Sequence, residues 1–176
     1  MLSRRTLIAS GLSVAALGTL GYGLWPRLGG YRDELERQRR LLTGDLTLQE
    51  LVRMSTLAAN GHNTQPWKFR LDEAGIKILP DLSRRTVVVD PDDHHLYVSL
   101  GCAAENLIIS ARANGRRADL TIQDAPEPQI DIALKNGPAR DSALYEAIPL
   151  RQSTRSIYDG QQISPDDIDL LKAAAQ

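Results

Sequence analysis

The stretch GHNTQPWKF, residues 61–69, decides how the rest of the chain is interpreted. Its first part is composed of turn-forming and amide residues, and Pro66 separates it from a run of alternating apolar and basic residues. The alternation over 67–71 predicts a strand with one buried face. Asp-Glu-Ala-Gly at 72–75 predicts a turn, and the alternation over 76–78 predicts a second strand, so the segment is expected to form a β-hairpin.

Two helical patterns precede this hairpin. Residues 47–59 carry apolar side chains at the i, i+3, i+4, i+7 spacing of an amphipathic helix, and Thr47 with Glu50 predicts a capping box at its start. Residues 31–42 also have a helical pattern, but they are rich in charge. Most of that first helix is therefore expected to be a solvated face.

Helices and strands also follow the hairpin. Residues 90–114 predict a long helix that is apolar nearly all round and therefore central and buried. Two further strands are predicted around 120–122 and 130–134, and a helix over 139–150. Ser164, followed by proline and two aspartates, predicts the start of a last helix. The expected fold class is α+β, with helices covering a small antiparallel sheet.

The loop before the first strand is a candidate binding site. Asn63 and Gln65 carry amides that both donate and accept hydrogen bonds, and loops between a helix and a strand are common places for ligand contacts. Such groups suit a planar heterocycle with alternating donors and acceptors. The alternative is a turn whose side chains bond only to their own backbone.

A second candidate is RQSTRSIY, residues 151–158. Arg151 and Arg155 are four residues apart with hydroxyls between them, and guanidinium groups bind phosphate in a bidentate manner. This pattern predicts a phosphate site. The alternative is a helix C-terminus whose arginines balance the helix dipole.

Composition excludes several classes of function. The 176 residues contain 21 Lys+Arg and 22 Asp+Glu, a net charge of −1, which argues against a general nucleic-acid binder. The single cysteine, Cys102, excludes an internal disulfide and a CxxC metal or redox motif. We assign no metal ligand and no catalytic side chain.

The N-terminus has the pattern of an export signal. Arg4 and Arg5 precede an uncharged run over 6–26, and the pair resembles a twin-arginine (Tat) signal, which a receptor of the Tat translocase reads. An ordinary Sec signal or a simple membrane anchor is the alternative. Residues 7–25 are long enough to cross a bilayer, so cleavage and retention as an anchor both stay open. The expected location is the periplasm or the outer side of the cytoplasmic membrane.

Taken together, the two candidate motifs resemble the nitroreductase superfamily of FMN-dependent oxidoreductases. The residues that match its Asn-x-Gln-Pro-Trp-x-Phe motif are Asn63, Gln65, Pro66, Trp67 and Phe69. Those that match its phosphate-binding Arg-x-Ser-x-Arg motif are Arg151, Ser153 and Arg155. The long apolar helix also carries the family's Ala-x-Asn-Leu pattern, at 104–107.

The motif order is inverted relative to the family, and no Arg-x-Ser-x-Arg precedes Leu46. Inverted order with a Tat-like leader resembles the Acg-type branch, whose members contain two nitroreductase-like halves. This resemblance implies a signal or anchor over 1–26, a first half over 31–138, and the start of a truncated, incomplete second half over 139–176. Asn60 is a departure, since the family has serine there.

The resemblance implies an FMN site, with reduced flavin carrying out two-electron reduction of an acceptor. The cofactor-binding residues would be Asn60, Asn63, Gln65, Arg151, Ser153 and Arg155. NAD(P)H and a small electron acceptor are the expected partners, and the oligomeric state stays open between a monomer and a homodimer. Two alternatives remain: a non-catalytic protein that binds or sequesters FMN, and an inactive truncated fragment.

Overall fold

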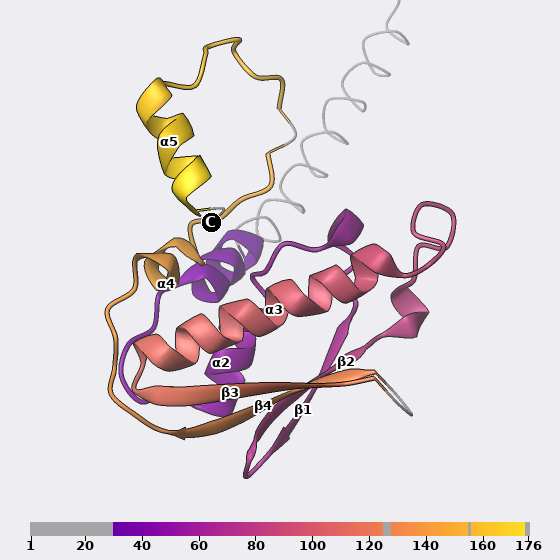
Figure 1. The fold of residues 1–176 in the computed structure, drawn as a ribbon, viewed down its shortest axis with the longest axis vertical. Helices are drawn as coiled ribbons and strands as arrows, with labels where there is room; N and C mark the ends of the chain where they lie inside the picture. Colours follow the sequence, from indigo (N-terminus) through magenta and orange to yellow (C-terminus); the bar gives the residue numbers. More distant parts are fainter. Residues whose placement is uncertain (1–29, 125–127, 155, 175–176) are drawn as a thin grey trace, which may run out of the picture.

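The structure, a computed structural model, describes residues 30–124, 128–154 and 156–174. Its centre is a four-stranded antiparallel sheet in the order β1-β2-β4-β3 (Figure 1). The strands are β1 (Trp67–Asp72), β2 (Gly75–Pro80), β3 (Arg116–Gln123) and β4 (Gln129–Asn136). The helices are α2 (Leu48–Ser55), η1 (Gly61–Asn63), η2 (Leu82–Arg84), α3 (His94–Ala113), α4 (Ala143–Ala147) and α5 (Pro165–Ala174). The fold is α+β, with helices on a small antiparallel sheet, as the sequence predicts.

The β1–β2 hairpin forms where it was predicted. Phe69 lies opposite Ile78, and Asp72 closes the turn because its carboxylate accepts the backbone N–H groups of the two residues after Glu73. β2 then pairs with β4, which places Ile76 opposite Ile132. The sheet therefore joins two sequence-local hairpins along β2 and β4.

Helix α3 packs against strands β2, β3 and β4 of the sheet and also against helices α2 and α4. Its buried side chains include Leu100 and Leu107, and a small-residue stripe at Ala103 and Ala104 lets α2 approach closely. The Ser55 hydroxyl on α2 donates to the Ala103 carbonyl at 2.7 Å, so this contact is both apolar and hydrogen-bonded. The prediction of a central, buried helix is confirmed.

Two N-terminal helices end earlier than predicted. Helical structure covers 30–39 rather than extending to 42, and the Arg53 guanidinium donates to the terminal carbonyls of Arg37, Gln38 and Arg40. Helix α2 begins at the predicted capping box but ends at Ser55 rather than at 59. There the chain tightens into i→i+3 hydrogen bonds, which often terminate a helix.

Two later helices also differ from prediction at their ends. Helix α3 begins at His94 rather than Asp90, because Asp93 has a left-handed backbone and the Asp90 carboxylate instead accepts the N–H groups of His95 and Leu96. Helix α4 is shorter than the predicted 139–150. Its N-cap is Ser142, and Pro149 prevents its continuation.

The segment after α4 lies outside the core. The Ser164 hydroxyl caps α5 as predicted, by accepting the Asp167 N–H at 3.1 Å. All described residues from 150 to 174 are exposed, and Figure 1 shows α5 standing away from the sheet. The proposed signal or anchor, 1–26, lies outside the described residues. Within the part of the chain that the structure describes, no helix combines the length and apolar character required to span a bilayer.

Candidate functional site

The loop between α2 and β1, which we call the site loop, has an unusual backbone. His62, Asn63 and Gln65 all have left-handed φ angles, 51°, 57° and 50°. Asparagine tolerates this conformation, but for most residues it costs about 1–3 kcal/mol, and such strain concentrates at functional sites. Surrounding contacts must therefore hold this loop in place.

Helix α3 holds the start of the loop. The Gly61 N–H donates to the Ser99 hydroxyl at 3.0 Å, and that hydroxyl donates to the His95 carbonyl at 2.6 Å. Within the loop, the Asn60 side-chain oxygen accepts the Gln65 N–H at 2.9 Å. Asn60 therefore fixes the backbone position of Gln65, another of the predicted site residues.

The segment after β2 holds the end of the loop. Arg84 donates from Nη1 to the Thr64 carbonyl at 2.9 Å, and its Nε lies 3.3 Å from an Asp81 carboxylate oxygen. The Ser83 hydroxyl and the Lys68 ammonium bond to the same carboxylate and lower the pKa of Asp81 to about 2. Asp81 is thus a buried anion that orients Arg84 toward the loop.

The RQSTRSIY segment reaches the same loop from the other side. Arg151 donates from Nε to the Leu57 carbonyl at 3.1 Å and from Nη1 to the Ser153 hydroxyl at 3.2 Å. Arg39 donates to the carbonyls of Pro149 and Arg151, at 3.0 and 2.8 Å. Residues that are about a hundred positions apart in sequence are joined here.

These segments enclose a polar pocket of about 620 Å³, which we call the site pocket. Its lining residues are Arg39, Ala59, Asn60, His62, Asn63, Arg151, Gln152 and Ser153. The structure therefore brings together four of the six residues predicted from sequence: Asn60, Asn63, Arg151 and Ser153. Gln65 lies on the same loop but not in the lining. Arg155 lies outside the described residues.

The chemistry of this lining suits an anionic, hydrogen-bonding ligand. It contains two arginines, three side-chain amides and a serine hydroxyl, with no carboxylate. Its volume is within the range of about 300–1,000 Å³ that is typical of small-molecule sites. These residues fit the phosphate and the polar edge of a flavin nucleotide. Ala59 is the one aliphatic residue in the lining, so the pocket by itself offers little surface for the flat face of a flavin ring.

Besides Ala59, three polar residues of the lining were not predicted. Arg39 belongs to the charge-rich helix whose face was interpreted as solvated, and no pattern in that helix singles out this arginine. Gln152 lies inside the arginine motif, between matched positions. His62 precedes Asn63 in the loop and points to no particular chemistry by sequence alone.

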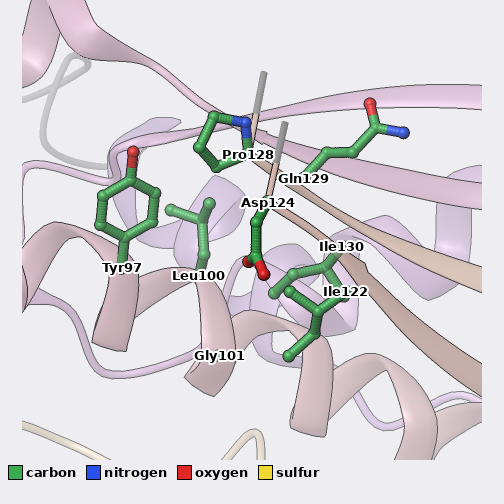
Figure 2. Close-up of a pocket in the computed structure, with 8 residues that line it drawn as sticks. All are labelled: Tyr97, Leu100, Gly101, Ile122, Asp124, Pro128, Gln129 and Ile130. Carbon is green, nitrogen blue, oxygen red and sulfur yellow. The ribbon is translucent and has the colours of Figure 1, made fainter. Parts of the chain in front are cut away.

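A second pocket, of about 440 Å³, lies between α3 and the β3–β4 hairpin (Figure 2). Its lining residues are Tyr97, Leu100, Gly101, Ile122, Asp124, Pro128, Gln129 and Ile130. It is mostly apolar and includes the Asp124 carboxylate but no arginine. Tyr97 and Gly101 are on the face of α3 opposite Ser99, which contacts the loop. This apolar pocket is therefore separate from the site pocket.

Comparison with known proteins agrees with the motif assignment. No protein-family model matches the chain. Two curated proteins of Mycobacterium tuberculosis, from strains CDC 1551 / Oshkosh and ATCC 25618 / H37Rv, are each 27% identical to it over 136 residues. Both are named "Putative NAD(P)H nitroreductase". The chain is similar to nitroreductases.

The alignment covers 73% of this chain but 39% of each relative, so the similarity concerns less than half of the relatives' length. It supports a relationship to the nitroreductase superfamily and suggests an oxidoreductase. The observed α+β fold is compatible with a nitroreductase-like architecture.

Proposed function

We propose that this chain binds FMN in the site pocket and acts as an FMN-dependent oxidoreductase of the nitroreductase kind. Electrons would come from NAD(P)H and pass two at a time to a small acceptor. The observation that carries the proposal is the meeting of the loop residues Asn60 and Asn63 with Arg151 and Ser153 around one pocket. The names of the two nitroreductase relatives support the same class of reaction.

In this proposal the arginines bind the phosphate. Arg151 uses Nε and Nη1 in contacts within the protein, which fix its guanidinium while Nη2 makes no hydrogen bond to the described residues. Arg39 places a second positive charge at the same pocket. Two cations without a carboxylate in the lining favour a dianionic ligand.

The loop amides would bind the polar edge of the ring. Asn63 provides a donor and an acceptor in the lining of the site pocket, on a loop that Ser99 and Arg84 hold from both ends. Gln65 lies on the same loop, next to the lining, and would contact the ring only at its edge. FMN supplies the hydride chemistry when bound, and the protein groups supply binding and orientation. No side chain is assigned as a general acid or base.

A second protein surface would cover the flat face of the ring. The site pocket offers only Ala59 as an aliphatic contact, whereas ligand sites usually bury most of a ligand's surface against apolar groups. We propose that a second nitroreductase-like half, begun by residues 139–176, or a second copy of the chain in a homodimer completes the site. Gel filtration with and without FMN distinguishes a dimer from a monomer.

Titration of the purified full chain with FMN tests the function. Binding should quench flavin fluorescence with saturation, and anaerobic addition of NADPH should bleach the yellow colour. Return of the colour on addition of a nitroaromatic acceptor would complete the cycle. Saturable binding without bleaching would favour the alternative, a non-catalytic FMN carrier. Absence of binding would contradict both and favour an inactive fragment.

We further propose export through the Tat translocase, directed by Arg4 and Arg5. The expected location is the periplasm or, if the N-terminal segment is retained, the outer side of the cytoplasmic membrane. Replacing both arginines by lysine should stop export while leaving synthesis unchanged. Cell fractionation measures this, and export that continues in the double variant would contradict the proposal.

A further inference from the structure

A third pocket, of about 490 Å³, lies at the C-terminal end of α3, where the helix meets the start of β3 and the segment after β4. We call it the arginine pocket, because its lining includes Arg112, Arg116, Arg117 and Arg140. Backbone hydrogen bonds fix its walls: Gly137 donates to Gly115 at 2.9 Å, and Arg140 donates to Arg112 at 3.1 Å. Its arginines come from three separate segments of the chain.

Only part of this positive charge is balanced. Arg117 pairs with Asp119 at 2.8 Å, and Arg116 pairs with Asp45 at 2.9 Å. Arg112 reaches a backbone carbonyl at 3.4 Å, and within the described residues neither it nor Arg140 has a carboxylate at ion-pair distance. Two guanidinium groups therefore lie at the pocket without an ion pair among the described residues, and the Asp119 carboxylate is the one acidic group in the lining.

The helix dipole accounts for little of this excess. The C-terminal end of α3 favours cations, but its partial charge is roughly half an elementary charge and its effect is confined to the last turn. That is less than the charge of the two unbalanced arginines. Their convergence on one pocket leaves an excess of positive charge at that place.

We infer that the arginine pocket binds the phosphoryl group of a small phosphorylated molecule. Guanidinium groups bind phosphate oxygens through paired N–H donors, and the Asn136 side chain in the lining adds an amide donor. A free phosphorylated metabolite and a phospholipid headgroup share this chemistry, and the experiment below separates them.

The arginine pocket is distinct from the site pocket. Ser99, which contacts the site loop, and Arg112 lie in different halves of α3, separated along the axis by about 20 Å at 1.5 Å per residue. The inference therefore does not depend on FMN binding. Its failure would leave the proposed function unaffected.

Calorimetric titration of the full chain with inorganic pyrophosphate at low ionic strength tests it. Wild-type protein should bind, and the Arg112→Gln/Arg140→Gln double variant should bind at least tenfold more weakly. Arg140→Gln alone gives a second measure that spares the Arg112 contact with Ala118, so a folding defect of the double variant would not obscure the result. Arg70→Gln removes one charge at an exposed position of β1, so it is the matched control for Arg140→Gln and should bind as wild type does.

Three results would overturn the inference. The first is that wild-type protein binds neither pyrophosphate nor phosphatidylglycerol vesicles, and the second is that the double variant binds as tightly as wild type. The third is that Arg151→Gln alone abolishes binding, which would place pyrophosphate in the site pocket. Co-sedimentation with phosphatidylglycerol vesicles, with phosphatidylcholine vesicles as reference, identifies the source of the phosphate. A further outcome is that the protein binds phosphatidylglycerol vesicles and not pyrophosphate. If that binding is lost in the Arg112→Gln/Arg140→Gln variant, the pocket recognises the phosphate of a lipid headgroup. FMN titration of the double variant should match wild type.

Discussion

The Arg151 guanidinium donates from Nε to the carbonyl oxygen of Leu57 at 3.1 Å, although 94 positions separate the two residues. Leu57 lies just after α2, at the entry to the site loop, and Arg151 begins the predicted phosphate motif. One side chain therefore connects the two sequence motifs on which the proposed function rests. The contact also fixes the direction in which the guanidinium is presented.

Removing this guanidinium should weaken FMN binding far more than folding. A hydrogen bond to a charged group contributes about 1.5–3 kcal/mol, so we expect Arg151→Gln to raise the FMN dissociation constant about 10- to 150-fold. The melting temperature should change little, because Arg151 is exposed. Fluorescence titration with FMN measures the first effect and thermal unfolding the second.

Arg151→Lys separates charge from geometry, because lysine keeps the positive charge but cannot form the paired contact. Its affinity should lie between those of wild type and Arg151→Gln. Arg70→Gln is the control for general charge loss and should bind FMN as wild type does. Equal affinities across the series would exclude Arg151 from the FMN site.

Arg84 should act by positioning the site loop. Arg84→Gln removes the hydrogen bond to the Thr64 carbonyl, which contributes about 1 kcal/mol to the free energy that holds the loop in its binding conformation. The FMN affinity should therefore be about fivefold weaker. Amide hydrogen exchange over 60–65 should become faster, while exchange in α3 stays as in wild type. These two readouts distinguish a local loop effect from a general loss of stability.

The neighbouring arginine is the matched control for this experiment. Arg85 pairs with Asp93 at 2.7 Å and makes no hydrogen bond to the loop among the described residues. Arg85→Gln should therefore leave exchange over 60–65 and FMN affinity unchanged. Equal loop protection in Arg84→Gln and wild type would contradict the positioning role.

Asp81 should make stability depend on acidity. Its pKa in the folded chain is about 2, below the ordinary 3.8, because Ser83 and Lys68 stabilise the carboxylate. Because the pKa is lower in the folded state, the ionised carboxylate stabilises the fold at any pH above the pKa of the unfolded state. This stabilisation is lost as the pH falls from about 4 toward 2. Urea unfolding of wild type and Asp81→Asn over this range should give a difference in free energy that shrinks as the pH falls. A difference that is independent of pH would show that Asp81 does not contribute in this way.

Two glycines should respond oppositely to alanine. A Cβ at Gly75 would lie 2.0 Å from the carbonyl oxygen of Ile132, so Gly75→Ala must displace the β2–β4 pairing and should cost about 1–3 kcal/mol or more. Gly101, on an exposed face of α3, has no atom within 4 Å of the same position. Gly101→Ala should stabilise the fold by about 0.5–1 kcal/mol. Urea unfolding measures both, and changes of the same sign would contradict the prediction.

The sequence predicts the elements of this fold better than their ends. Alternation in the hairpin and the apolar character of α3 are strong periodic patterns, and both elements were confirmed. The ends depend on side chains from elsewhere in the fold or on backbone angles that periodicity does not report. Arg53, which lies on α2, bonds to the end of the helix over 30–39, and the left-handed backbone of Asp93 places the start of α3 at His94.

The candidate site shows the same division. Asn63 and Arg151 belong to motifs that are visible in sequence, and the pocket brings them together. Arg39 belongs to no such motif, because it lies on a charge-rich helix in which nothing in the sequence distinguishes one arginine from another. Only the fold places it beside Pro149. Asp81 and Arg84 act from behind the loop, so no binding motif includes them.

The pairing of β2 with β4 has a consequence for how the chain folds. Each hairpin closes a short loop, but the β2–β4 ladder joins segments about 50 residues apart, with a loop-closure cost of about 3–4 kcal/mol before its contacts form. Helix α3 spans that interval and packs on both hairpins. The rate-limiting step of folding should therefore be the docking of the two hairpins onto α3, and substitutions on its sheet-facing side should slow folding rather than speed unfolding.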